Sequence, residues 1–157
     1  MEVNIYLPFK PVSFQSYKIG KGRLFKPSKL IYYERDVLSS LLKYEDKLNQ
    51  FFQMFDRAEL CLKTTWYFQY KNFYPSKGEK RISAQTLDVD NSVKNTQDII
   101  FKLMVDKYGL DINDKDICCS SVFKGPGKKD GIYLTIKMLK LEEIDILFKE
   151  LSESVFT

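Results

Sequence analysis

Two aspartates and a lysine stand close together in the middle of the chain, where an extended segment gives way to a helical pattern. Asp88 and Asp90 are two residues apart, so on an extended segment both carboxylates point to the same side. Lys94 follows four residues after Asp90, which places it one turn along the same face of the predicted helix. We therefore expect two hard oxygen donors and one cation at a helix N-terminus, where backbone amides also favour anions.

Convergent carboxylates repel each other, and a bound cation relieves that repulsion. Mg²⁺ suits this position because it takes few protein ligands, keeps several waters and leaves room for phosphate oxygens. The segment before a later strand offers a third acid, either Asp114 or Asp116. Three aspartates and one lysine match what phosphodiester hydrolysis requires, because the metal activates water and the lysine offsets developing charge. An alternative interpretation is that these aspartates only cap a helix, with Asp90 or Asn91 at the N-cap.

The chain has 157 residues and contains no histidine. This excludes Ser-His-Asp and Cys-His chemistry and a histidine general base, so any chemistry must rest on carboxylates, lysine, tyrosine or a metal held by oxygen ligands. The three cysteines, Cys61, Cys118 and Cys119, have no CxxC spacing, and the two adjacent ones point to opposite faces of a strand. A structural zinc site lacks ligands, and we expect buried, reduced thiols.

The net charge of +4 is unevenly distributed. Basic residues dominate from Lys10 to Arg35, whereas acids dominate from Leu141 to Thr157. This separation predicts a polyanion-facing surface away from an acidic tail, with phosphate contacts from the basic loops Lys18 to Lys29 and Lys77 to Arg81. No apolar run is long enough to cross a bilayer, and the first residues do not resemble a signal peptide. We therefore expect a cytoplasmic protein without a membrane partner.

Hydrophobic periodicity predicts one small α+β domain with the element order β-α-β-α-β-β-α and a mixed sheet packed against helices. The expected strands cover residues 2–7, 59–70, 117–123 and 131–138, the last two joined as a hairpin by the loop 124–131, and the expected helices cover 29–50, 91–107 and 141–155. Ser28 is predicted to cap the first helix and Gly109 to end the second. Residues 9–28 and 73–85 are predicted to be loops. Residues 141–157 are expected to form an acidic amphipathic helix within the same domain as residues 1–140.

The motif Leu87-Asp88-Val89-Asp90-Asn91-x-x-Lys94, followed by Asn113-Asp114-x-x-Ile117, resembles the active-site pattern of RusA-type Holliday-junction resolvases. The N-terminal Ile5-Tyr6-Leu7-Pro8-Phe9-x-Pro11 and the helix start Tyr32-x-x-x-Asp36-Val37 are similar to that family too. The resemblance implies that Asp88, Asp90 and Asp114 bind the metal and that Lys94 is the catalytic lysine. Asp98 and Asp106, farther along the helix, are expected to lie on a solvated face or to support the site indirectly.

The resemblance also implies an endonuclease domain over residues 1–140 that nicks four-way DNA junctions symmetrically, as an obligate homodimer and with Mg²⁺ or Mn²⁺. A two-fold dimer suits that task because each protomer presents one site to one of two symmetric strands. We expect an apolar patch at Phe51, Phe52 and Phe55 to contribute to the interface. The chain departs from the family where Asn113-Asp114 stands in place of two acids, so Asp116 competes as a third ligand. An alternative function is a non-catalytic DNA-binding module, which would bind DNA in a salt-sensitive way without Mg²⁺.

Overall fold

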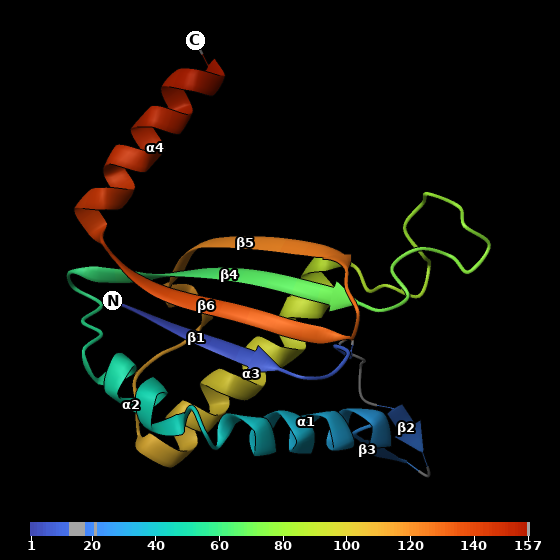
Figure 1. The fold of residues 1–157 in the computed structure, drawn as a ribbon. Coiled ribbons are helices and arrows are strands. Elements are labelled where there is room, and N and C mark those ends of the chain that lie inside the picture. Colours follow the sequence, from blue (N-terminus) through green and yellow to red (C-terminus); the bar gives the residue numbers. More distant parts are fainter. Residues whose placement is uncertain (13–17, 21, 157) are drawn as a thin grey trace.

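The computed structural model describes every residue except 13–17, 21 and 157, and shows one mixed sheet packed against helices (Figure 1). The strands are β1 (Glu2–Leu7), β2 (Lys18–Gly20), β3 (Arg23–Phe25), β4 (Leu60–Tyr70), β5 (Ile117–Pro126) and β6 (Gly131–Lys140). The helices are α1 (Ser28–Leu41), α2 (Glu45–Gln53), α3 (Val89–Tyr108) and α4 (Leu141–Phe156), with a short 3-10 helix η1 (Asp114–Asp116) before β5. The predicted α+β class is therefore confirmed, with two strands and one helix break beyond the predicted order.

The four-stranded sheet has the order β1-β6-β4-β5. β6 lies antiparallel to both β1 and β4, whereas β5 lies parallel to β4. The predicted hairpin between the last two strands is therefore wrong, because β4 lies between β5 and β6. Their connecting loop passes the end of β4, where the Gly127 amide donates to the Tyr70 carbonyl at 3.1 Å and the Lys71 amide donates to Asp130 at 2.9 Å. The short connection over residues 124–131 predicted a hairpin, but the long strand β4 takes a hydrogen-bonding neighbour on each edge and separates the two strands.

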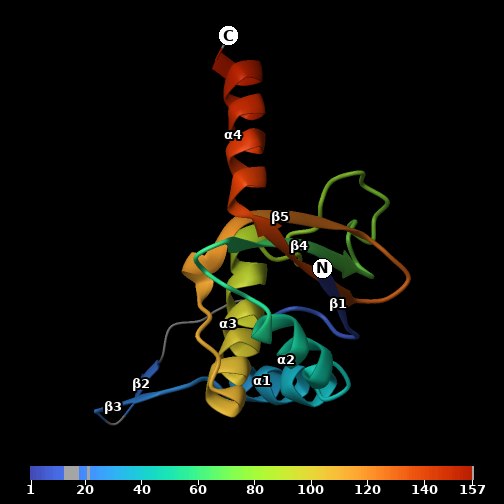
Figure 2. The same ribbon diagram turned by 90° about the vertical axis from the view of Figure 1, so that its left-hand side faces the viewer.

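One face of the sheet forms the core. Val3, Ile5 and Leu7 of β1 alternate with less buried residues, as predicted, and are themselves buried. Trp66 and Phe68 of β4 are fully buried, with nearly parallel rings whose centroids are 5.7 Å apart. Figures 1 and 2 show α1, α2 and α3 on this side of the sheet, whereas no described helix covers the opposite face. The domain therefore has two layers, and one sheet face is open.

The predicted helix over residues 29–50 is two helices separated by a short turn at Tyr44. The apolar spacing continues unbroken through this turn, so the sequence pattern did not reveal it. Tertiary contacts produce the break: the Tyr44 hydroxyl accepts a hydrogen bond from the Tyr6 amide of β1 at 3.1 Å. Glu45, the first residue of α2, binds Lys107 near the end of α3. These contacts hold the start of α2 against β1 and α3.

Residues 9–28, predicted to be a loop, contain the hairpin of β2 and β3. Gly22 lies between these strands with a φ of +73°, a backbone conformation that favours glycine. The N-cap of α1 is Pro27 rather than the predicted Ser28, which is the first helical residue. The Pro27 carbonyl accepts the Leu30 amide at 3.0 Å, so the backbone starts the helix without a side-chain cap.

The phenylalanines at the end of α2 belong to the core rather than to an exposed patch. Phe51 and Phe52 are only 3% and 2% exposed, and Phe55 is half-buried. Phe52 packs edge-to-face against Phe101 of α3, with centroids 5.9 Å apart. The expectation that Phe51, Phe52 and Phe55 supply a dimer interface is therefore wrong, because α2 folds them against the core of their own chain.

The C-terminal helix α4 forms as predicted but stands away from the rest of the protein (Figures 1 and 2). It is attached at its base, where the Leu141 amide donates to the Glu59 carbonyl and the Lys140 amide donates to Glu143, both at 3.0 Å. Beyond this base its apolar side chains are exposed, with Phe148 at 72%. None of the described helices is long and apolar enough to cross a membrane.

Candidate active site

Asp88 is the N-cap of α3, and Asp90 lies in its first turn. The helix begins earlier than predicted, so neither Asp90 nor Asn91 is its cap. The backbone of Asp88 is extended (φ −60°, ψ 148°), and its carbonyl accepts the amide and the hydroxyl of Ser92 at 3.0 and 2.9 Å. The Asp88 carboxylate makes no capping hydrogen bond, and both Asp88 and Asp90 are exposed. No side-chain hydrogen bond therefore supports the interpretation that Asp88 only caps the helix.

The backbone just before this helix is anchored to the ends of two strands. The Leu87 amide donates to the Tyr70 hydroxyl at 3.3 Å. The Lys124 ammonium group donates to the Leu87 carbonyl and to the Thr86 hydroxyl, both at 3.1 Å. Burial raises the pKa of Tyr70, so its hydroxyl stays protonated at neutral pH. Sequence analysis missed Tyr70 and Lys124, because nothing in their spacing links them to the aspartates.

Lys94 and Asp98 continue the surface of α3 that Asp90 begins, at intervals of four residues. Partial burial raises the pKa of the Asp98 carboxyl; Lys94 counteracts part of that rise, and Asp114 adds to it. Lys94, Asp98 and Asp114 thus share one electrostatic neighbourhood, although Asp114 lies beyond the end of α3. The sequence predicts a solvated face or an indirect role for Asp98. Its position four residues after Lys94 is the sequence feature that links it to the candidate site.

The two candidates for a third acid have different environments. Asp116 is buried and accepts hydrogen bonds from Arg57 at 2.6 and 2.9 Å and from the Asn113 amide at 2.9 Å. The Arg57 guanidinium group holds the pKa of Asp116 below its ordinary value. Arg57 also binds Asp111 at 2.9 Å, a residue for which the sequence suggested no role. Asp114, by contrast, is exposed at the start of η1.

The structure does not gather all the predicted ligands. Among the residues it describes, no three Asp, Glu or Cys side chains lie close enough together to share one metal ion, so Asp88, Asp90 and Asp114 do not form a single group. The donor chemistry of the first two nevertheless fits Mg²⁺, which takes one or two carboxylates and completes its shell with water and phosphate oxygens. The extended backbone ends at Asp88 and Asp90 is already helical, so the prediction that the two carboxylates share one side of an extended segment is wrong. The candidate site therefore consists of two exposed carboxylates at the start of one helix, and Asp114 is not grouped with them.

The basic loop from Lys77 to Arg81 is exposed and belongs to the segment between β4 and α3, which extends away from the sheet (Figure 1). Arg81 forms an ion pair with Glu79 at 2.5 Å, which offsets part of the local positive charge. This segment leads into Asp88, so its other two basic residues, Lys77 and Lys80, lie on the stretch of chain that precedes the candidate site.

The basic loop from Lys18 to Lys29 is described only in part. Lys26 forms an ion pair with Glu34 of α1, and Lys29 is exposed. Lys21 lies outside the described residues, and only the backbone of Lys18 is described. The predicted phosphate contacts of this loop therefore remain predictions.

The cysteines differ from one another more than expected. Cys61 is buried, whereas Cys118 and Cys119 are exposed, so the expectation of three buried thiols holds only for the first. The sulfurs of Cys61 and Cys118 lie 2.9 Å apart on the neighbouring strands β4 and β5. Burial raises the pKa of Cys61 to about 12, so this thiol is protonated at neutral pH and is a poor nucleophile or metal ligand.

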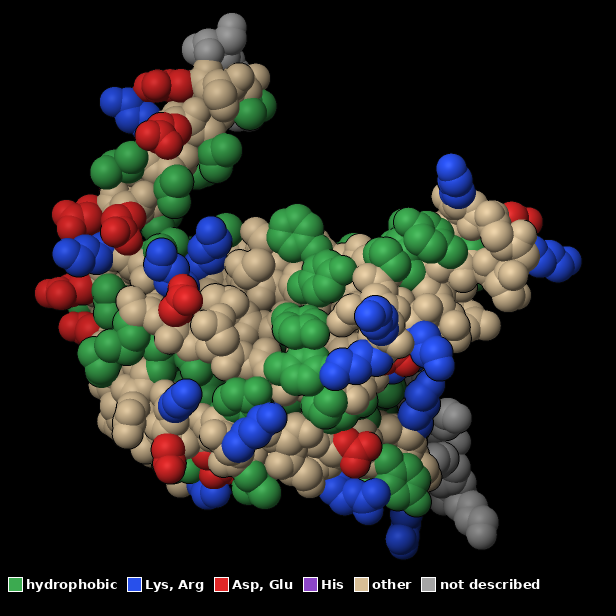
Figure 3. All heavy atoms as spheres, viewed as in Figure 1, with side chains coloured by type: hydrophobic (Ala, Val, Ile, Leu, Met, Phe, Trp, Pro, Cys, Tyr) green, Lys and Arg blue, Asp and Glu red, His purple; other side chains and the backbone are tan. Residues whose placement is uncertain are grey.

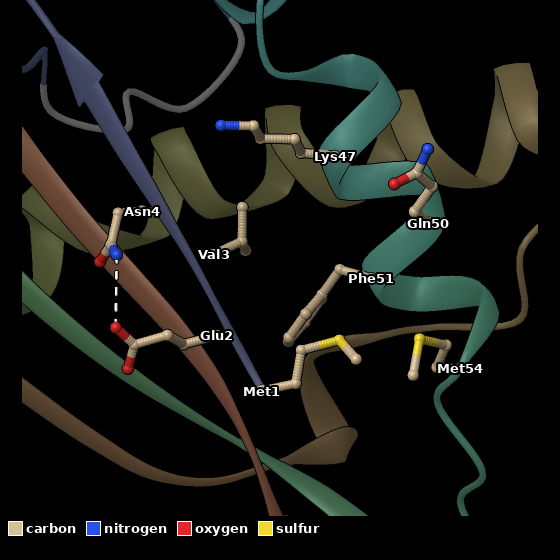
Figure 4. A pocket seen from close by; sticks show the side chains of 8 residues that line it. All are labelled: Met1, Glu2, Val3, Asn4, Lys47, Gln50, Phe51 and Met54. Atoms are coloured by element: carbon tan, nitrogen blue, oxygen red, sulfur yellow. Dashed lines mark hydrogen bonds between the residues drawn. The ribbon is translucent and has the colours of Figure 1, made fainter.

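A hollow of about 350 Å³ lies between β1 and α2 (Figure 4). Its lining residues are Met1, Glu2, Val3, Asn4, Lys47, Gln50, Phe51 and Met54. Glu2, the one acid among them, accepts a hydrogen bond from Asn4 at 3.4 Å. None of the predicted site residues lines this hollow, so it has no part in the proposed chemistry.

Comparison with known proteins gives no family assignment: no protein-family model matches the chain, and no curated protein matches it. The resemblance to RusA-type resolvases rests on the motif residues of this sequence.

Proposed function

We propose that the protein is a Mg²⁺-dependent endodeoxyribonuclease that cuts four-way DNA junctions, the activity implied by the resemblance to RusA-type resolvases. The observation that carries the proposal is the first half of α3, where Asp90, Lys94 and Asp98 follow one another at intervals of four residues. A helix N-terminus favours phosphate, and the acids beside it favour a hard cation. With no histidine in the chain, oxygen-bound metal chemistry is the route to hydrolysis that these residues support.

Asp88 and Asp90 would hold the ion, because both carboxylates are exposed and belong to the same helix start. When bound, Mg²⁺ supplies an activated water and neutralises charge on the phosphate. Lys94, one turn farther into the helix, would contact a phosphate oxygen and offset the charge that develops as the bond breaks. Tyr70 and Lys124 act as positioning residues, since they fix the backbone that enters Asp88.

Asp114 is the proposed third acid. Asp116 is engaged by Arg57 and by the Asn113 amide, and its carboxylate is buried. Asp114 is exposed and acts electrostatically on Asp98. These differences favour Asp114 over Asp116 for contact with metal or substrate.

A homodimer is part of the proposal, and α4 offers a surface for it. Five apolar residues recur along this helix at alternating intervals of three and four: Leu141, Ile144, Phe148, Leu151 and Val155. That is the a and d spacing of a two-stranded coiled coil. Four of the five acids of α4 lie at b, c and f positions outside this seam: Glu142, Glu143, Glu150 and Glu153. A second copy of the chain is therefore the proposed occupant, because pairing two seams covers the apolar stripe without facing those acids against one another.

A non-catalytic DNA-binding module is the second candidate. One observation favours it, namely that Asp88, Asp90 and Asp114 are not gathered into one group. Such a module would bind DNA in a salt-sensitive way that neither Mg²⁺ nor the charge of Asp88 affects.

Labelled four-way junctions incubated with Mg²⁺, Mn²⁺ or EDTA distinguish the two candidates. The nuclease proposal predicts paired, symmetric nicks with either metal and none with EDTA, resolved on a denaturing gel. Tight junction binding without cleavage in any of the three conditions would favour the binding module.

A further inference from the structure

The open face of the sheet carries four aromatic residues in register. Tyr6 of β1 lies opposite Tyr133 of β6, Tyr133 opposite Tyr67 of β4, and Tyr67 opposite Phe123 of β5. The ring centroids of Tyr6 and Tyr133 are 4.7 Å apart, and those of Tyr67 and Tyr133 are 6.1 Å apart. Figure 3 shows hydrophobic side chains gathered in a row across the middle of the sheet. These four residues, here called the aromatic row, cross every strand of the sheet.

Two glycines next to the aromatic row leave space for its rings. A Cβ atom on Gly131 would lie 2.9 Å from the ring of Tyr6, and one on Gly125 would lie 2.8 Å from the Tyr67 hydroxyl. The side chains of Tyr6 and Tyr67 thus occupy the space that a side chain at Gly131 or Gly125 would need. In this position the Tyr6 hydroxyl is buried, whereas Tyr67 stays exposed.

The surroundings of the aromatic row suit a polyanion. The Lys129 ammonium group lies 5.2 Å from the ring centroid of Tyr6. Farther along the strands, Lys137 and Lys63 lie opposite each other, with Glu2 beside Lys137. Between these lysines and the aromatic row is a row of short polar residues: Asn4, Thr135, Thr65 and Ser121. Rings, hydrogen-bonding groups and cations therefore occur together on one open face.

Cross-strand aromatic pairs also stabilise sheets without any ligand. That role explains contact between neighbouring rings, but it does not require exposure. Phe123 is 57% exposed, Tyr133 41% and Tyr67 37%, and no described helix covers this face. Exposed aromatic rings with nearby lysines on a four-stranded sheet are the features with which proteins bind unpaired nucleotides, by stacking bases and neutralising phosphates.

We propose that the aromatic row is a binding platform for single-stranded DNA, with unpaired bases stacked on Tyr67, Tyr133 and Phe123. Lys129 on one side and Lys63 with Lys137 on the other contact the phosphates. The platform is independent of the nuclease proposal, because its residues belong to the strands and lie on the open face, whereas the acids belong to the start of α3 and to η1. It binds without sequence preference, since every base offers a face for stacking.

Fluorescence anisotropy with a labelled twelve-nucleotide oligo-dT tests the platform at low salt without Mg²⁺. Phe123→Ala and Tyr133→Ala should each weaken binding by roughly 5- to 150-fold, the range expected for the loss of one stacked base. Tyr133→Phe keeps the ring and should bind like the unaltered protein. Tyr32→Ala, which removes an equally exposed aromatic residue from α1, is the matched control and should leave affinity unchanged. Circular dichroism melts establish that each variant is folded.

Three results would overturn the platform. One is that the unaltered protein does not bind the oligonucleotide. The second is that Phe123→Ala and Tyr133→Ala bind as tightly as Tyr32→Ala. The third is that Phe123→Ala changes the molar mass in light scattering but not the affinity for DNA, which would make the face a protein interface. Asp90→Asn should bind the oligonucleotide normally, so a failure of the nuclease proposal stays distinguishable from a failure of the platform.

Discussion

Arg57 holds the carboxylate of Asp116 through two hydrogen bonds, from Nε at 2.6 Å and from Nη2 at 2.9 Å. The two residues are 59 positions apart, so the pair joins the turn before β4 to the segment before β5. The neighbouring Asp114 remains exposed. The sequence offers both acids as candidates for a third ligand. In the structure Asp116 makes a structural contact, whereas Asp114 is accessible.

Asp116→Asn should destabilise the fold by about 1–3 kcal/mol, because it weakens charge-assisted hydrogen bonds to a buried carboxylate. Asp114→Asn should leave stability unchanged and greatly reduce junction cleavage. Urea unfolding and cleavage assays on both variants test this division. The assignment is wrong if Asp116→Asn loses cleavage at full stability while Asp114→Asn cuts normally.

Lys94→Ala should lose most of the cleavage rate and keep its affinity for metal, because a lysine can stabilise phosphate charge without binding the ion. Single-turnover cleavage and Mn²⁺ titration separate the two effects. Lys102→Ala, farther along α3 and paired with Asp106 at 2.5 Å, is the control and should cut normally. A large fall in Mn²⁺ affinity with an unchanged rate would contradict the role given to Lys94.

The elements that follow local rules could be predicted from the sequence. Alternating Val3, Ile5 and Leu7 predicted β1, and Gly109 ends α3 with a φ of 65° as expected. The predictions of a hairpin and of a single first helix were wrong, because contacts between residues far apart in the sequence outweighed the local hydrophobic pattern. β4 inserts between β5 and β6, and contacts of Tyr44 with β1 help to divide the first helix.

Some residues of the candidate site could likewise be predicted from the sequence, and others could not. Asp88, Asp90 and Lys94 could be proposed from spacing alone, because they lie at the N-cap and in the first two turns of one helix. Lys124 could not, because its bonds to the backbone before Asp88 depend on β5 lying beside β4. The preference for Asp114 over Asp116 likewise depends on Arg57, which only the folded chain brings near.

Phe148→Glu should convert the proposed homodimer into a monomer, because it places a charge in the centre of the α4 seam. Ile146→Glu is the matched control, since Ile146 is also exposed but lies outside the seam. Light scattering at micromolar concentration should give the dimer mass for the control and the monomer mass for Phe148→Glu. Equal masses for the unaltered protein and both variants would remove α4 from the interface.

Glu45→Gln should destabilise the protein at neutral pH by about 1–3 kcal/mol, because Glu45 binds Lys107 and the Tyr108 hydroxyl. The hydrogen bond from Lys107 lowers the pKa of Glu45 below its ordinary value of 4.5. The contribution of the carboxylate is therefore fully present above pH 4.5 and is lost as the pH falls through the lower pKa of the folded protein.

Urea unfolding at pH 7 and at pH 4 checks this dependence. The difference in stability between the unaltered protein and Glu45→Gln should shrink at the lower pH. Asp46→Asn, an exposed acid in the same helical turn, should show neither effect. A difference that stays constant between the two pH values would contradict the role of the Glu45 charge.

The most direct test of the proposed nuclease is cleavage of a four-way junction by Asp90→Asn, with binding measured on the same preparation. Removing this charge takes away one of the two carboxylates proposed to hold Mg²⁺ and lessens repulsion of phosphate. It leaves the Asp88 carbonyl, which accepts the Ser92 amide at the start of α3, unchanged. The proposal predicts no cleavage with Mg²⁺ or Mn²⁺ and junction binding as tight as that of the unaltered protein or tighter. Cleavage at a near-normal rate would contradict it and remove Asp90 from the active site.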